Sequence, residues 1–206
     1  MMMIKEFGGR VASVWDGLRP MTKKMLVGAL QSSNSTQLNK APNFSYDAHA
    51  DWEVSRLLTA LDEQSRTKEV RKDQARRAEI EQLAETCVRV LEAQTASAEV
   101  FIQLAERVIR EHDYAKLDKL ADLLAHRFSA GEIAEIVRQT DLPQIRAIAF
   151  ETLALMPIPA ILPLLDDQLY SVIAANALEQ KAFEFDSDEA RDILDRFDSE
   201  SEMRGD

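Results

Sequence analysis

The sequence predicts an all-α protein in which antiparallel helical pairs stack on one another as an α-solenoid, with a helical extension at the N-terminus. The first observation behind this prediction is a pattern that occurs three times between residues 113 and 180. Each copy has an aspartate, an apolar or aromatic residue four positions later, an alanine after four more and an apolar residue after another four. The copies are Asp113, Leu117, Ala121 and Ala125; Asp141, Ile145, Ala149 and Leu153; and Asp166, Tyr170, Ala174 and Leu178. A spacing of four places these side chains on one helical face, and so short a unit must stack on its neighbours to bury that face.

The second observation is the composition. The 206 residues are 46% hydrophobic and 30% charged, which suits one ordinary domain or one repeat array with an extension. The net charge of −11 argues against general binding to nucleic acid, because such binding needs a positive field. Residues 1–45 hold six Lys/Arg and two Asp/Glu, so they carry +4 and the rest of the chain carries −15. This asymmetry predicts two surfaces with different roles, or reflects simple drift of surface charge.

The cysteine count and the hydropathy pattern predict a cytoplasmic protein without an integral membrane segment. Cys87 is the only cysteine, so an intramolecular disulfide and a cysteine-rich metal site are excluded. The longest uncharged apolar stretch, 152–165, contains three prolines and is shorter than the ~20 residues that a spanning helix needs. The N-terminus lacks the clean apolar run and the cleavage site of a signal peptide.

Residues 1–30 are predicted to form a basic amphipathic arm. Its apolar residues follow helical spacing, and Lys23 and Lys24 lie opposite the second apolar stripe, Met21–Leu30. Such an arm can fold back on the array, dock into a partner's groove or lie on an anionic membrane surface. The candidate contact residues here are Trp15, Met21, Lys23, Lys24 and Met25. Residues 31–46 are rich in Ser and Asn and are predicted to be a polar linker.

Residues 47–94 are predicted to be a long helical segment. Trp52, Leu57, Leu58 and Leu61 are expected on one buried face of its first part. A stripe of apolar residues at helical spacing runs from 80 to 91 and includes Cys87, which we expect to be a small buried hydrophobe rather than a nucleophile.

The middle of this segment, 66–77, reads as a basic helix. It holds six Lys/Arg and two acids, and Arg71, Lys72 and Arg76 are candidate contact residues. A basic face of this kind can grip phosphates, or it can be a solvated helix with internal ion pairs. No aromatic residue is interleaved for stacking on bases, which favours the solvated helix.

Residues 95–197 are predicted to contain the helical repeats and a C-terminal capping helix. The expected pairs are 98–111 with 114–127, 130–139 with 142–155, and a short proline-rich helix near 158–165 with 167–182, followed by the capping helix 187–197. The aspartate that opens each pattern is expected to be an N-cap, and Ser129 with Glu132 is expected to form a capping box. Residues 198–206 are predicted to be an acidic disordered tail.

The second pattern has a specific resemblance. The run Asp141-Leu142-Pro143-Gln144-Ile145-Arg146, followed by Ala149 and Leu153, resembles the second helix of a HEAT-type repeat. The third copy has Ser171 and the first has Asp118 where the repeat has arginine, and the resemblance covers roughly residues 98–183. It implies an α-solenoid whose usual role is to bind another macromolecule. It also implies that Arg146 is structural and pairs with Asp166.

Catalytic and metal-binding motifs are not found in the sequence. None of the histidines, His49, His112 and His126, has metal-ligand spacing, and the last two lie where the negative end of a helix dipole favours imidazole. The glycines form no phosphate-binding loop, and no nucleophile motif is present. We therefore expect no catalytic residue, cofactor or metal.

The sequence thus predicts a non-enzymatic protein–protein interaction module, an adaptor or scaffold, that binds a protein partner through helical-repeat surfaces. The alternative is a nucleic-acid-binding helical-repeat protein that uses the basic helix 66–77 and the N-terminal arm, although the repeats themselves are acidic. A third and less favoured hypothesis is a peripheral membrane adaptor that binds through residues 1–45.

Overall fold

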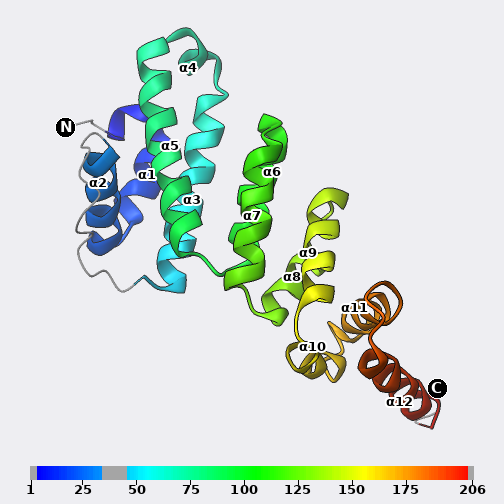
Figure 1. The fold of residues 1–206 in the computed structure, drawn as a ribbon. Coiled ribbons are helices and arrows are strands. Elements are labelled where there is room, and N and C mark those ends of the chain that lie inside the picture. The colour runs from blue at the N-terminus through cyan, green and yellow to red at the C-terminus, as the bar shows by residue number, and fades with distance from the viewer. Residues whose placement is uncertain (1–3, 34–45, 204–206) are drawn as a thin grey trace. The chain divides into compact units, whose positions relative to one another are not determined.

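The computed structural model describes residues 4–33 and 46–203, and over these residues it confirms the all-α prediction. The described residues form twelve α-helices and one short 3₁₀ helix, with no β-strand among them. The chain divides into two compact units, Met1–Thr95 and Ala96–Asp206 (Figure 1). Each unit has its own buried core, and the two are described separately.

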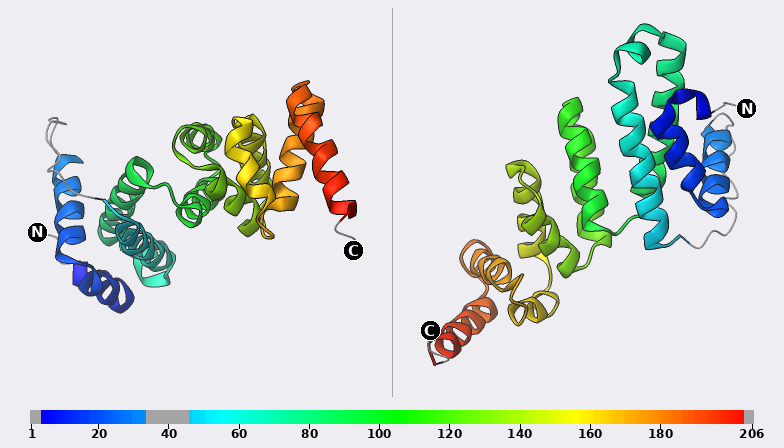
Figure 2. Two further views of the ribbon diagram at one scale, coloured as in Figure 1. Left: turned by 90° about the horizontal axis from the view of Figure 1, so that it is seen from below. Right: turned by 180° about the vertical axis from the view of Figure 1, so that it is seen from behind.

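Unit 1 begins with the 3₁₀ helix η1 (Ile4–Phe7), followed by α1 (Gly9–Gly17) and α2 (Pro20–Ser33). Helix α1 packs on η1 and α3, and α2 packs on α3 and α5, so the N-terminal arm folds back on its own unit (Figure 2). The turn into α1 requires glycine at position 8, because its φ is 137° and an added Cβ would lie 2.6 Å from the Gln64 side chain.

The remainder of unit 1 is a helical hairpin. Helices α3 (Ala48–Ser65) and α5 (Gln74–Gln94) lie side by side, and the short helix α4 (Lys68–Lys72) caps their connection (Figure 1). The segment 47–94 is therefore three helices, because Thr67 and Asp73 interrupt it. The Thr67 hydroxyl accepts from the N–H of Val70, and the Asp73 carboxylate accepts from the N–H of Arg76.

The core of unit 1 lies between α3 and α5. Leu57, Leu58 and Leu61 are fully buried, and so is Cys87, as predicted. The expectation for Trp52 was wrong, since 50% of its side chain is exposed. Trp52 precedes Leu57 by five residues, which places it about 140° away around the helix. It belongs to the outer face of α3.

Unit 2 consists of helical pairs that pack on one another (Figure 2). The helices are α6 (Ala98–Glu111), α7 (Tyr114–Arg127), α8 (Ala130–Gln139), α9 (Pro143–Leu155), α10 (Ile158–Leu165), α11 (Ser171–Glu184) and α12 (Asp188–Met203). Helix α8 packs on α6 and α10, α9 packs on α7 and α11, and α12 packs on α11. Every helix therefore covers the apolar face of a neighbour.

Two predicted segment ends differ from the structure. Helix α12 continues to Met203, so residues 198–203, which were expected in the disordered tail, are helical. The first residues of the expected linker, 31–33, belong to α2. Residues 34–45 of the linker, residues 1–3 and the last tail residues, 204–206, lie outside the described part of the chain.

Only one of the three pattern aspartates is an N-cap. Asp113 caps α7 and accepts from the N–H of Lys116 at 3.0 Å, as predicted. Helix α9 begins after Leu142 with Pro143, which has no N–H for a cap to satisfy. Asp166 ends α10, and α11 begins after Tyr170. The apolar spacing predicted the buried faces in the second and third copies, where Ile145, Ala149, Leu153, Ala174 and Leu178 are all fully buried. In the first copy Leu117 is buried, but Ala121 is half-buried and Ala125 is exposed.

The expected capping box at α8 is half formed. Ser129 caps α8 and accepts from the N–H of Glu132 at 3.3 Å. The Glu132 carboxylate does not return to Ser129. It accepts from the N–H of Ala98 at 2.6 Å, where α6 begins and where Ser97 provides no side-chain cap. Glu132 therefore joins the N-termini of α6 and α8, with its negative charge at the positive end of a helix dipole.

Two further contacts lie in unit 2, one within the second helical pair and one between the second pair and the third. The expected ion pair of Arg146 with Asp166 is absent among the described residues, because Arg146 donates to the carbonyl of Thr140 at 2.5 Å. Tyr170 donates its hydroxyl proton to Glu135 of α8 at 2.8 Å. Hydrogen bonds from Arg138 first, and then from Tyr170, lower the pKa of Glu135 to about 2, although partial burial opposes them.

We expect the substitution Phe101→Ala to destabilise unit 2 strongly. Phe101 is buried on α6, and its ring meets that of Phe128 edge to face with centroids 5.6 Å apart. Removing a buried phenylalanine leaves a cavity that costs about 3–5 kcal/mol of unfolding free energy. The control Tyr114→Ala removes an exposed ring and should change the unfolding free energy by less than about 0.5 kcal/mol. Urea unfolding followed by far-ultraviolet circular dichroism measures both, and equal midpoints would show that Phe101 is not a core residue.

Candidate functional site

The predicted contacts of the N-terminal arm are divided between the inside and the outside of unit 1. Thr22 and Leu26 of α2 are buried against the hairpin. Met21 and Lys24 lie on the outer face, with Met21 one of the exposed large apolar residues. An arm packed in this way has only part of its apolar stripe available to a membrane or a partner.

The other three arm residues are half-buried. Trp15 lies near the end of α1, and Met25 lies in the middle of α2. Lys23 donates from Nζ to the carbonyl of Asp16 at 3.0 Å. These three side chains therefore contribute at least partly to the packing of unit 1.

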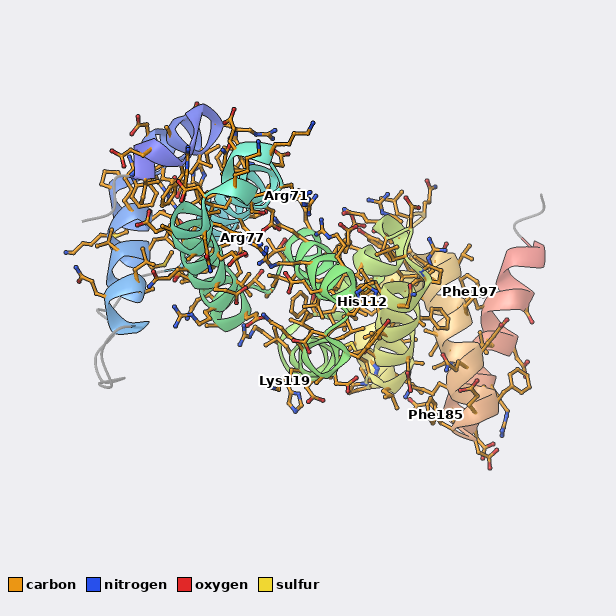
Figure 3. All side chains as sticks on the ribbon, turned by 90° about the horizontal axis from the view of Figure 1, so that it is seen from above. Arg71, Arg77, His112, Lys119, Phe185 and Phe197 are labelled. Atoms are coloured by element: carbon orange, nitrogen blue, oxygen red, sulfur yellow. The ribbon has the colours of Figure 1, made fainter. Side chains whose placement is uncertain are left out.

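Arg66 follows the end of α3, and the other basic residues of 66–77 are divided between α4 and the start of α5 (Figure 3). Arg71 and Lys72 are exposed at the tip of the hairpin. The guanidinium of Arg76 is half-buried and donates to the carbonyl of Glu6, which attaches η1 to α5. Of the predicted basic contacts, Arg71 and Lys72 are available to a partner, and Arg76 has a structural role.

A cluster of hydrogen-bonded charges fixes the start of α2 to the start of α3. We call it the Arg19 clasp, and it comprises Arg19, Thr22, Asp47 and Glu53. Glu53 is 2% exposed and accepts from the main-chain N–H of Arg19 at 2.6 Å, from its Nε at 3.0 Å and from the Thr22 hydroxyl. The two terminal nitrogens of Arg19 donate to Asp47 at 3.0 and 2.7 Å. Every polar atom of this carboxylate–guanidinium pair is directed to a partner.

The clasp lowers the pKa values of its carboxyl groups. Burial alone would raise the pKa of Glu53, but the hydrogen bonds from Thr22 and Arg19 outweigh it, and the pKa lies below its ordinary value. The bond from Arg19, helped by the N–H of Ala50, holds the pKa of Asp47 far below its usual range. Both groups are therefore ionised at neutral pH.

Asp51 anchors a second network in unit 1. Its carboxylate accepts from the Tyr46 hydroxyl at 2.5 Å and from the Thr95 hydroxyl at 3.0 Å. Burial and the bond to Asp51 raise the pKa of Tyr46 above its ordinary value. Sequence reasoning missed both networks, because apart from the Tyr46–Asp51 contact their partners lie 28 to 44 residues apart, outside the apolar periodicity.

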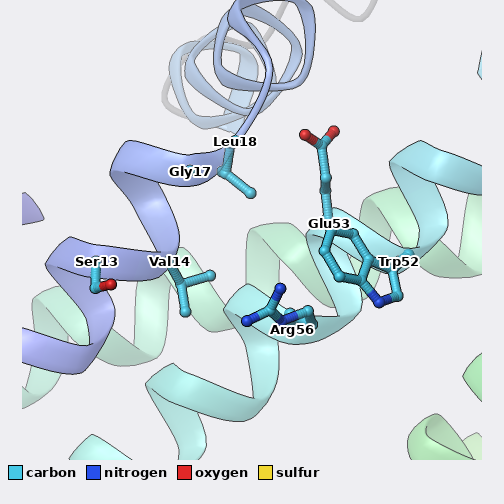
Figure 4. A pocket seen from close by; sticks show the side chains of 7 residues that line it. All are labelled: Ser13, Val14, Gly17, Leu18, Trp52, Glu53 and Arg56. Carbon is cyan, nitrogen blue, oxygen red and sulfur yellow. The ribbon is translucent and has the colours of Figure 1, made fainter.

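A pocket of about 150 Å³ lies beside the clasp, between α1 and α3 (Figure 4). It is lined by Ser13, Val14, Gly17, Leu18, Trp52, Glu53 and Arg56. The guanidinium of Arg56 lies over the Trp52 ring, 4.5 Å from its centroid. Among the described residues, no carboxylate forms an ion pair with Arg56. Trp52 was predicted as a core residue, so sequence reasoning also missed this pocket.

An exposed apolar surface lies on α11 in unit 2. Val172 is 69% exposed and Phe183 is 79% exposed. Their separation of eleven residues is three helical turns, so they share one face. Leu169, 64% exposed, lies just before the helix, and we call these three residues the α11 face. The repeat pattern carries a signal for this face, since Val172 and Phe183 fall outside the positions that it assigns to the core.

The histidines lie near helix ends, as predicted. His112 is the left-handed C-cap residue of α6, and His126 Nδ1 is 2.7 Å from the carbonyl of Asp122 in the last part of α7. The described residues contain no group of three or more His, Cys, Asp or Glu side chains arranged to hold a metal ion.

No single helix of the described chain is both long enough and apolar enough to cross a membrane. Helices α9 and α10 meet the length and composition requirement only together, and a bend of 113° separates them.

Comparisons of the chain with known protein families, with curated proteins and with solved structures found no match.

We expect the substitution Arg19→Gln to destabilise unit 1 in a pH-dependent way. A carboxyl group whose folded pKa is depressed contributes stability above its unfolded pKa, and this contribution is lost as the pH falls through the folded pKa. The ordinary values are 4.5 for Glu53 and 3.8 for Asp47. The difference between wild type and variant should therefore be full at neutral pH and shrink as the pH falls below these values.

Tryptophan fluorescence during urea unfolding measures this effect, because both tryptophans lie in unit 1. The control Arg77→Gln removes an exposed ion pair with Glu81 and should change the midpoint little at any pH. A difference between wild type and Arg19→Gln that stays constant down to pH 2 would contradict the role of these carboxylates.

Proposed function

We propose that the chain is a non-enzymatic adaptor or scaffold that binds a protein partner, and that unit 2 is a HEAT-like α-solenoid. The packing of α8 between α6 and α10, and of α9 between α7 and α11, supports the solenoid. The apolar spacing of the second and third sequence patterns also supports it, since Ile145, Ala149 and Leu153 and then Ala174 and Leu178 lie in the core. The single buried Cys87 suits a cytoplasmic setting.

The α11 face is the observation that carries the proposal of a protein partner. Ala174, Ala177, Leu178 and Ala182 of the same helix are fully buried, while Val172 and Phe183 are among the most exposed large apolar side chains of unit 2. Apolar surface left open to water is unfavourable, so exposed apolar side chains that share one face of a helix support a contact with a partner. Asn176 and Glu179 lie between them on the same face, and both are exposed to form polar contacts.

The perturbed carboxyl groups support a structural role for the charged networks. Strongly shifted pKa values also occur at active sites. Here, neighbouring structural donors account for the lowered pKa values: the guanidinium of Arg19 for Asp47, the Thr22 hydroxyl followed by Arg19 for Glu53, and the guanidinium of Arg138 for Glu135. Each of these groups connects two helices, which favours an adaptor over an enzyme.

We expect the α11 face to be required for partner binding. The double substitution Val172→Ser/Phe183→Ser removes the apolar contacts without touching the core. The intact protein, immobilised and incubated with native lysate, should retain a defined protein, and the double variant should retain about tenfold less of it. The control Leu155→Ser/Tyr114→Ser removes two exposed apolar side chains elsewhere in unit 2 and should bind normally. Equal retention by the α11 variant would refute this surface.

The alternative of nucleic-acid binding has one supporting observation. Arg66, Lys68, Arg71 and Lys72 are all exposed on and beside α4. If these cations bind phosphates, the bound material in the capture experiment should vanish when nuclease is added.

Binding to duplex DNA at low salt tests this alternative directly. We expect no binding by the wild-type protein, since the net charge is −11. If the wild-type protein does bind, the slope of its log affinity against log salt concentration reports the number of counterions released. A slope smaller by about two in the variant Arg71→Glu/Lys72→Glu would assign the function to this basic tip.

A further inference from the structure

We propose that the pocket between α1 and α3 is a second binding site, separate from the α11 face. It takes one apolar side chain of a partner peptide, and an Asp or Glu next to that side chain pairs with Arg56. The inference depends only on unit 1, so it stands or falls independently of the proposed α11 contact.

The size of the pocket selects the kind of ligand. Pockets for small molecules usually measure about 300–1,000 Å³, whereas this one measures about 150 Å³. One side chain fits such a volume, and a cofactor-sized molecule does not. Val14, Leu18 and the Trp52 ring provide apolar walls, so an apolar side chain is favoured over a polar one.

The charges of the lining select the neighbouring residue of the ligand. The two charged residues of the lining are Glu53 and Arg56. Glu53 already accepts three hydrogen bonds within the Arg19 clasp, so its charge is compensated. Arg56 lies over the face of Trp52, and no carboxylate of the described residues forms an ion pair with it. A guanidinium without a carboxylate partner presents several N–H donors in one plane. These donors can form two parallel hydrogen bonds with the two oxygens of a carboxylate.

The pocket is also preformed. The cation–π contact with Trp52 holds the Arg56 side chain in place before a ligand arrives. The clasp anchors Glu53 and the start of α2, and these flank Leu18 in the pocket wall. Preorganisation reduces the entropy lost on binding. Tryptophan and arginine are moreover the residues that contribute most often to binding energy at protein interfaces.

Gly17 offers a selective way to close the pocket. It is the last residue of α1 and lines the pocket, and a Cβ added there would meet no atom within 4 Å. A leucine at this position therefore adds bulk at the pocket wall without displacing the core. Gly9, the first residue of the same helix, is equally open, but it does not line the pocket. Gly17→Leu and Gly9→Leu thus form a matched pair of substitutions.

The test selects random twelve-residue peptides, displayed on phage, against the immobilised full-length protein. We expect the selected peptides to share an apolar residue within two positions of an Asp or Glu. Synthetic copies are then titrated in a Trp15→Phe background, where Trp52 is the only remaining indole and its emission reports on the pocket. Gly17→Leu should weaken binding about thirtyfold, Arg56→Glu about tenfold, and Gly9→Leu not at all.

The proposal is overturned if no peptide family is selected, or if Gly17→Leu binds the peptides as tightly as Gly9→Leu. Peptides that lack an acidic residue, or that are unaffected by Arg56→Glu, overturn the assigned ligand chemistry. Thermal unfolding by circular dichroism checks that the variants fold. If Gly17→Leu does not fold, the binding of the peptides to Arg56→Glu, which changes an exposed residue, tests the site instead. Peptides should bind Val172→Ser/Phe183→Ser normally, which separates this site from the α11 face.

Discussion

The fold depends on one constraint, which is that a short helix has a single apolar face and must find another element to cover it. In unit 2 each helix meets this requirement by packing on its partner and on the next pair, so α8 lies between α6 and α10. In unit 1 the α3–α5 hairpin provides the covering surface, and α1 and α2 bury their inner residues on it. The burial of apolar faces is non-directional, and it fixes which surfaces meet more firmly than it fixes where a helix begins.

Directional interactions supply what burial does not. The Arg19 clasp fixes the start of α2 on the start of α3, and Asp51 joins α3 to Tyr46 and Thr95. In unit 2, Glu132 and Glu135 have the same function at the ends of α6 and α11. All of these contacts use a carboxylate, and all but that of Tyr46 with Asp51 use a donor that is distant in sequence. An acidic protein therefore uses part of its negative charge internally, at points where helices meet.

Local signals explain how much of the structure could be predicted. Apolar spacing predicted the helical class, the pairs of unit 2 and the buried positions of Cys87, Ile145 and Leu178, because periodicity reports directly on which face is buried. The prediction for Trp52 was wrong, because this residue was assigned to the face of the neighbouring leucines although it lies about 140° around the helix from Leu57. The N-caps predicted at Asp141 and Asp166 were also wrong. Helix α9 begins at Pro143, and Asp166 lies in the turn between α10 and α11. The pocket and the clasp needed long-range positions that no spacing rule contains.

The bridge from Glu132 to Ala98 has a consequence for synthesis of the chain on the ribosome. The first turn of α6 has no side-chain cap of its own, and the acceptor for its leading N–H lies in α8. Helix α6 therefore leaves the exit tunnel incomplete and stays so until residue 132 has also emerged. An unmade N-cap costs about 1 kcal/mol, so the first helical pair of unit 2 is expected to reach its full stability only when the start of the second pair has also emerged.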